Sequence, residues 1–216
     1  MTGMTGALFF DLDGTLTDPK VGIVRCIGHA LDALGVPVPA DDDLLWCIGP
    51  PLRTSFAQML GGETRVEQAI QLYRERFSTI GMFENAVYDG VPELLGTLND
   101  RGHRLFVATS KPHVYAAQIL DHFELSGFFE RVFGAELDGV RADKTDLLAY
   151  AIRETKVQPE TAWMIGDRKH DIIGARANAV NAVGVLYGYG SRDELEQADA
   201  HALVARPSEL VQVLHA

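Results

Sequence analysis

Two aspartates separated by a single residue follow a short apolar run near the start of the chain. Residues 7–10 are all apolar, and Asp11, Asp13 and Gly14 come directly after them. An apolar run of this length beside a glycine turn is typical of a buried strand. Side chains at positions i and i+2 of a strand point to the same side, so we expect the two carboxyl groups to converge. Converging carboxylates repel, which predicts a cation or a positive side chain between them.

Two further apolar runs end in polar residues. Residues 104–108 form one run and residues 162–165 the other, and a segment of helical spacing lies between them. The polar residues that follow these runs or begin that segment are, in chain order, Thr109, Ser110, Lys144, Asp167 and Asp171. Side chains of these types bind phosphate groups or metal ions.

Each of these polar residues also has a purely structural explanation. Asp11 and Asp13 are compatible with a turn that uses aspartate for its hydrogen bonds. Thr109 is suited to cap a following helix, and Lys144 to lie exposed in a first helical turn. Asp167 is suited to cap another helix, with a further acid placed for its dipole. Because the structural explanation requires four coincidences in one chain, we favour the functional interpretation.

The order of these residues resembles the four signatures of the haloacid dehalogenase superfamily of phosphotransferases. The signatures are Asp11-Leu12-Asp13-Gly14-Thr15, then Thr109, then Lys144, then Gly166-Asp167 with Asp171 four residues later. The resemblance extends from residue 7 to about residue 190. It implies an α/β protein with a Rossmann-like, doubly wound parallel sheet and an inserted all-helical cap domain.

The resemblance also implies a role for each site residue. Asp11 is expected to attack phosphorus as a nucleophile, and Asp13 to act as general acid and then as general base. Mg²⁺ is expected as cofactor, bound by Asp11, by the backbone carbonyl of Asp13 and by Asp167, with Asp171 behind them. The residues expected to hold the phosphate are Thr109, Ser110 and Lys144.

The acid at position 13 discriminates among subclasses of the superfamily. Dehalogenases and phosphonate-cleaving relatives lack it, and the latter use a cap lysine, whereas residues 21–110 contain no lysine. The resemblance therefore implies a phosphomonoester hydrolase of the phosphoglycolate-phosphatase type. Residues 48–52, 136–139, 166–171 and 186–190 are similar to a 5′-nucleotidase-like branch. A sugar-phosphate mutase of the same superfamily and a phospho-receiver switch domain are the alternatives.

Two parts of the chain differ in pattern. Residues 17–86 show helical spacing and no convincing strand, so we predict a cap there, with residues 1–16 and 87–216 as a discontinuous core. Arg53, beside the turn at residues 49–51, is the cap residue expected to contact the substrate. In the core, apolar runs alternate with helical patterns, which predicts a parallel sheet that binds its ligand at the carboxyl ends of the strands. The expected strands are 7–10, 105–108, 132–135, 162–165 and 182–186, and the expected helices are 92–99, 112–123, 144–155, 171–178 and 208–214.

Composition narrows the class of partner. The 216 residues include 19 basic and 30 acidic ones, a net charge of −11 that argues against nucleic acid polymers and anionic membranes. There is no apolar run of membrane-spanning length and no basic leader, so we expect a cytoplasmic protein. Cys26 and Cys47 are expected to be free thiols. The expected partner is a small phosphorylated metabolite, bound by a monomer or a homodimer.

Overall fold

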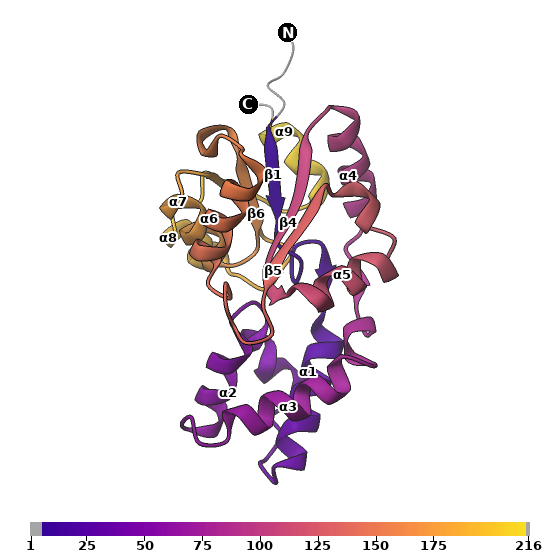
Figure 1. Cartoon of the computed structure of the whole chain (residues 1–216), viewed down its shortest axis with the longest axis vertical. Helices are drawn as coiled ribbons and strands as arrows, with labels where there is room; N and C mark the ends of the chain where they lie inside the picture. Colours follow the sequence, from indigo (N-terminus) through magenta and orange to yellow (C-terminus); the bar gives the residue numbers. More distant parts are fainter. Residues whose placement is uncertain (1–5, 215–216) are drawn as a thin grey trace.

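A single six-stranded parallel sheet forms the centre of the protein (Figure 1). The computed structural model describes residues 6–214. Its strand order is β5-β4-β1-β6-β7-β8, so the connections run in opposite directions on the two sides of β1. This doubly wound arrangement confirms the predicted fold class and puts a binding crevice at the carboxyl end of β1. The strands of the sheet are β1 (Ala7–Phe10), β4 (Arg104–Pro112), β5 (Arg131–Ala135), β6 (Trp163–Gly166), β7 (Asn181–Val185) and β8 (Ala202–Val204).

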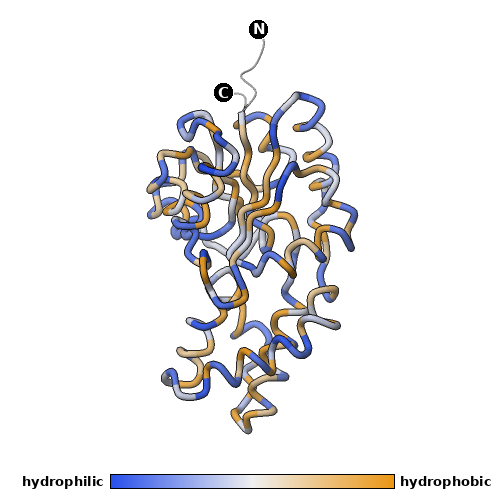
Figure 2. The backbone as a smooth tube through the Cα atoms, viewed as in Figure 1, coloured by the Kyte–Doolittle hydropathy of each residue, from blue (hydrophilic) through white to orange (hydrophobic). Residues whose placement is uncertain are grey.

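Both faces of the sheet are covered, which explains why its strands are apolar throughout. Leu8 and Phe10 face one hydrophobic cluster, whereas Phe9 faces the other and stacks on Phe106 with ring centroids 5.1 Å apart. Figure 2 shows the apolar strands between helices whose outer turns are more polar. One face is covered by α4 (Val91–Asp100), α5 (His113–His122) and α9 (Leu210–Val213), and the other by α6 (Lys144–Thr155), α7 (Lys169–Ala177) and α8 (Arg192–Gln197).

Residues 17–86 form a helical segment beyond the carboxyl ends of the strands (Figure 1). Apolar residues recur on α3 at helical spacing, and Tyr73 and Phe77 are buried there. Tyr73 contacts Phe56 edge-on, with ring centroids 6.2 Å apart. The segment therefore has an apolar interior of its own. Its elements are α1 (Lys20–Ala33), η1 (Asp41–Cys47), α2 (Leu52–Leu60), α3 (Val66–Phe77) and η2 (Gly81–Phe83).

Two short antiparallel strands join the helical segment to the sheet. Thr17–Asp18 (β2) pairs with Ala86–Val87 (β3), and Tyr88 N donates to the carbonyl of Leu16 at 3.1 Å. Strands of two residues are too short to show an alternating pattern, so the sequence did not indicate them. They lie within the two segments, residues 16–19 and 82–90, that lead into and out of the helical segment.

Other elements differ from the sequence prediction in extent. β4 continues to Pro112, with an irregular register after Thr109. α8 and β8 were not predicted, although Ser191 Oγ accepts from Glu194 N at 3.1 Å in an ordinary helix cap. The closing helix begins as a 3₁₀ turn, η5 (Pro207–Glu209). The remaining 3₁₀ turns are η3 (Ser126–Phe128) and η4 (Pro159–Thr161).

The cysteines and the longest helices bear on two expectations from composition. Cys26 and Cys47 are buried and free, as expected. Within residues 6–214, no helix combines the length and the apolar character needed to cross a membrane. Residues 1–5 and 215–216 of the predicted core lie outside the described range.

Candidate active site

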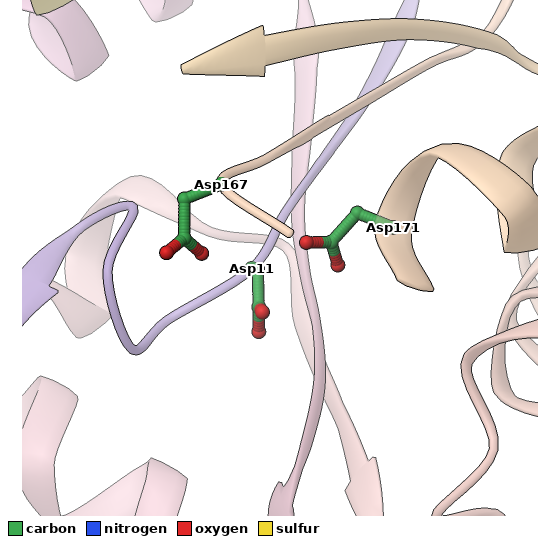
Figure 3. Close-up of side chains that lie close together, drawn as sticks. All are labelled: Asp11, Asp167 and Asp171. Atoms are coloured by element: carbon green, nitrogen blue, oxygen red, sulfur yellow. The ribbon is translucent and has the colours of Figure 1, made fainter. Parts of the chain in front are cut away.

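Three buried aspartates meet at the carboxyl ends of the two central strands (Figure 3). Asp11 follows β1, Asp167 follows β6, and Asp171 lies in the first turn of α7. Each offers a carboxylate oxygen, and these oxygens all lie within 4.8 Å of one another. The sheet therefore brings together three acids that are up to 160 residues apart in the chain.

Local backbone geometry explains how the acids approach so closely. Asp11 N donates to the carbonyl of Ile165 at 2.9 Å, which continues the parallel pairing one residue past β1. Gly14 has φ +80, and a Cβ there would lie 2.2 Å from Asp167 Oδ2. A Cβ at Gly166 would lie 2.2 Å from Oδ2 of Asp171. Only glycine fits these two positions, because any side chain would occupy the space of a carboxyl group.

Backbone amides hold one oxygen of each of the two acids beyond β6. Tyr189 N donates to Asp167 Oδ2 at 2.8 Å, and Arg168 N donates to Asp171 Oδ2 at 3.1 Å. Burial and the charges of Asp171 and Asp11 nevertheless raise the pKa of Asp167 well above its ordinary value. The surrounding protein groups therefore do not fully offset the free-energy cost of burying the ionised carboxylate of Asp167.

Lys144 places a buried ammonium group beside two of the acids. It occupies the first turn of α6, which Asp143 caps. Its Nζ donates to the carbonyl of Ala108 at 2.9 Å and lies 3.1 Å from Asp11 Oδ1 and 2.7 Å from Asp171 Oδ1. Burial opposes the charged form of Lys144, but the two carboxylates outweigh it and raise its pKa. The lysine is therefore held charged against Asp11.

Asp13 lies outside this group of three acids and takes a different partner. Its Oδ2 lies 2.7 Å from Nζ of Lys111, and its Oδ1 is buried without a hydrogen-bond partner. Burial raises the pKa of Asp13, with Lys111 opposing that effect. β1 ends at Phe10 and the chain turns at Gly14, so the alternation expected for a strand does not continue through both aspartates.

Lys111 is a further charged residue at this site, and its role was not predicted from the sequence. One feature of the sequence could have indicated this role. Lys111 lies two residues after Thr109 in an extended stretch, so the two side chains are expected on the same face of the strand. Thr109 is buried, and its Oγ1 accepts from Lys111 N at 3.3 Å. Ser110 borders the cavity described next. The residues expected to hold phosphate thus lie at the same edge of the sheet as the acids.

A cavity of about 610 Å³ lies between the helical segment and the core. Asp13 and Lys111 border it from the core, and Ile70, Tyr73 and Phe77 of α3 form an apolar wall opposite. Arg53 also lines it, but half of its side chain is exposed, and its guanidinium pairs with Glu63 at 3.3 Å and with Glu67. Its expected contact with substrate stays a prediction.

The charges around this site fit a divalent cation. Within the described residues, four buried carboxylates face two buried ammonium groups, which leaves an excess of two negative charges when all are ionised. Carboxylate oxygens are the ligands that Mg²⁺ takes in proteins. The charged groups are Asp11, Asp13, Asp167, Asp171, Lys111 and Lys144.

Fold and site together define a class of protein: a parallel α/β enzyme with buried acids and a lysine at the switch point of its sheet. Residues 8–185 match the family model described as haloacid dehalogenase-like hydrolase. The chain therefore belongs to the haloacid dehalogenase-like hydrolase family, and it is a phosphatase by class. The resemblance inferred from the sequence is confirmed.

Three relatives illustrate the similarity. A Pseudomonas aeruginosa protein named 5′-nucleotidase is 46% identical over 208 residues, which make up 96% of this chain and 94% of that protein. A Mycobacterium tuberculosis protein named tyrosine-protein kinase PtkA is 43% identical over 88% of this chain, which spans 65% of its length. The crystal structure of a predicted phosphatase from Clostridium acetobutylicum has a TM-score of 0.94 and 42% identity, with 98% and 99% of the two chains covered.

Proposed function

We propose that the protein is a Mg²⁺-dependent phosphomonoester hydrolase that works through an aspartyl-phosphate intermediate. The observation that carries the proposal is the setting of Asp11, which lies among buried acids and beside a buried lysine. Its Oδ1 accepts from Leu12 N at 2.7 Å and pairs with Lys144 at 3.1 Å. These contacts orient the carboxylate, and Oδ2 is the oxygen that would attack phosphorus.

The reaction takes two displacements at phosphorus. In the first, Asp11 forms a bond to phosphorus, the ester P–O bond breaks, and Asp13 gives its proton to the leaving oxygen. In the second, water attacks phosphorus while Asp13 takes a proton from it, and the acyl-phosphate bond breaks to release phosphate. The raised pKa of Asp13 favours the protonated form that the first step needs.

The other site residues bind the phosphoryl group in this scheme. Lys144 offers its ammonium group, Thr109 its hydroxyl and Ser110 its backbone N–H to the phosphoryl oxygens. When bound, Mg²⁺ supplies positive charge that neutralises the same oxygens. Asp11, Asp167 and the backbone carbonyl of Asp13 would hold it, with Asp171 completing the acidic surroundings.

Residues 17–86 act as a mobile cap in this proposal, with β2 and β3 as the hinge. A two-stranded connection of two residue pairs supports motion more readily than a wide sheet does. The cavity lies between this segment and the core, so moving the segment would open or close it. Closure would exclude water from the phosphoryl group during the first displacement.

We favour a 5′-nucleotide over phosphoglycolate as the substrate. The cavity of about 610 Å³ far exceeds a glycolate group, and Ile70, Tyr73 and Phe77 give its α3 wall an apolar, aromatic part beside Glu67 and Arg74. A second anionic group would need a cation without a partner. Each cation that lines the cavity already has one: Arg53 pairs with Glu63 and Glu67, Arg74 donates to the carbonyl of Leu137, and Lys111 pairs with Asp13. The 46% identical relative named 5′-nucleotidase supports the same choice. We also expect the protein to act on free metabolites in the cytoplasm, as a monomer or a homodimer.

A substrate panel tests this function. Phosphate release is measured on nucleoside 5′-monophosphates, phosphoglycolate and sugar phosphates, with Asp11→Asn as the inactive control. A higher kcat/KM for nucleotides supports the proposal, and a preference for phosphoglycolate contradicts the substrate choice. Sugar bisphosphate interconversion without phosphate release would favour the mutase instead. A tyrosine peptide added as acceptor shows whether phosphate is transferred rather than released.

A further inference from the structure

Lys111 connects the core to the helical segment through a buried contact on each side. Its Nζ lies 2.7 Å from Asp13 Oδ2 in the core and 4.5 Å from the centre of the Phe77 ring on α3. Only 6% of its side chain is exposed. A desolvated ammonium group over an aromatic face is held by the ring quadrupole, so both contacts constrain the same atom.

Neighbouring aromatic rings hold Phe77 in place. Tyr73 stacks on it with ring centroids 5.2 Å apart and an interplanar angle of 17°. Tyr115, on α5 of the core, contacts it edge-on at 5.4 Å. Phe77 is 3% exposed and lies in the last turn of α3. Its position therefore follows the packing of the whole helical segment against the core.

The contact with Lys111 leaves the two oxygens of Asp13 unequal. Oδ2 pairs with the ammonium group, whereas Oδ1 is buried without a hydrogen-bond partner. Asp13 borders the cavity, as do Lys111 and Phe77. A lysine side chain has a flexible four-carbon stem, so its ammonium group orients a carboxyl group only while its own position is held.

We infer that Lys111 is a positioning residue that orients the carboxyl group of Asp13 toward the leaving oxygen, and that Phe77 holds Lys111 only while the helical segment is packed on the core. The inference rests on the proposed role of Asp13 as general acid. It makes proton donation to the leaving group depend on closure of the helical segment, through one side chain from each part.

Two aryl phosphates of similar size but different leaving-group quality test this inference. Phenyl phosphate needs a proton on its leaving oxygen, whereas 4-nitrophenyl phosphate depends on it much less. Lys111→Met is expected to lower kcat on phenyl phosphate about tenfold more than on 4-nitrophenyl phosphate, a part of the roughly 10²–10⁴ available from a general acid. KM should change little on either ester. Lys111→Arg keeps the charge and should restore part of the difference.

Phe77→Leu and the double variant test the aromatic contact. Phe77→Leu should also lower kcat more on phenyl phosphate than on 4-nitrophenyl phosphate, but by a smaller factor than Lys111→Met. The double variant should show no larger difference between the two esters than Lys111→Met alone. Phe83→Leu is the matched control, because Phe83 also lies on the helical segment and contacts His122 of the core at 4.6 Å. Lys156→Met is the control for loss of an exposed lysine. Thermal unfolding of each variant shows that it is folded.

Asp13→Asn separates failure of this inference from failure of the proposed function. If Asp13→Asn loses activity equally on both esters, Asp13 is not the general acid and the proposed function is wrong at that residue. If Asp13→Asn is selective but Lys111→Met is not, the positioning role of Lys111 is overturned. If Lys111→Met loses more activity on phenyl phosphate but Phe77→Leu does not, proton donation does not depend on the packing of the helical segment. A rise in KM on both esters would instead assign Lys111 to phosphate binding.

Discussion

The two sides of the cavity differ in how their charged side chains are buried and paired. On the core side, acids such as Asp11 and Asp167 are buried beside one another, and Lys144 and Lys111 form ion pairs with members of this acidic group. In the helical segment, Arg53 is half exposed and pairs with two nearby glutamates. The core therefore leaves buried charge uncompensated, whereas the helical segment pairs this cavity-lining arginine with carboxylates at its surface.

The difference indicates a division of labour between the two parts. Repulsion among buried carboxylates costs folding free energy, and active sites commonly accept such a cost. Ion pairs at the surface contribute little to the free energy of folding, whether favourable or unfavourable. Chemistry is therefore expected to fail when a core charge changes, while charge changes in the helical segment should affect binding and stability by smaller amounts.

The largest expected effect is that of Asp11→Asn. An amide cannot form the acyl phosphate, so turnover should fall below detection on every phosphomonoester. The variant should still fold, because removing one of the crowded carboxylates relieves repulsion with Asp167 and Asp171. Phosphate release and thermal unfolding measure the two effects. Activity within about tenfold of wild type would show that Asp11 is not the nucleophile.

Removal of the metal should be nearly as severe. A chelator is expected to abolish turnover, Mg²⁺ to restore it, and Ca²⁺ to restore it poorly, because its larger and looser coordination shell misplaces the phosphoryl group. Mg²⁺ should also raise the thermal unfolding midpoint of the chelated protein, since it binds only the folded arrangement of acids. Full activity in excess chelator would contradict the metal requirement.

Arg53→Ala is expected to have a modest effect on the helical side. It should raise KM for a 5′-nucleotide about two- to fivefold, because an exposed and already paired charge contributes under about 1 kcal/mol. Hydrolysis of a small phosphoester should stay unchanged. Glu67→Gln removes one ion-pair partner of Arg53. In that background, Arg53→Ala should raise KM by a larger factor than it does in the wild type. Equal losses on both substrates would assign Arg53 a structural role.

The smallest expected effect concerns stability in the helical segment. The carboxylate of Glu84 accepts from Arg76 and from Arg25, each at 2.6 Å, and the hydrogen bond from Arg76 lowers its pKa. Because the pKa of Glu84 is lower in the folded state, its ionised carboxylate stabilises the fold at pH values above the ordinary pKa of 4.5. This stabilisation is lost as the pH falls through the folded-state pKa. Glu84→Gln should therefore lose about 1 kcal/mol at neutral pH.

Urea unfolding at pH 7 and at pH 3 measures the pH dependence of this loss. The difference between Glu84→Gln and wild type should shrink at the lower pH, because the unfolded chain binds a proton at this glutamate once the pH is below the ordinary pKa of 4.5. Glu75→Gln, at an exposed position of α3, is the matched control and should differ little from wild type at both values. A loss that is independent of pH would mean that the side chain acts through packing.

Local patterns were sufficient to predict the sheet and most of the acids. β1 and α6 have the predicted bounds, because an uninterrupted apolar run and a well-capped amphipathic helix are encoded within a few residues. Strands shorter than four residues, such as β2, β3 and β8, carry too few positions for a pattern. Asp11 and Asp167 were expected to lie together because the ends of neighbouring parallel strands meet at one edge, and Lys144 was expected beside them because the order of the motifs resembles the family.

What the sequence by itself determined is a set of candidate site residues and the edge of the sheet where they gather. Only the tertiary structure decided their partners: that Asp13 pairs with Lys111, that Phe77 covers that lysine, and that Glu67 neutralises Arg53. The physical reason is that periodicity encodes which face of an element is buried. Which two side chains then meet depends on how separate helices and strands pack, which no local pattern records.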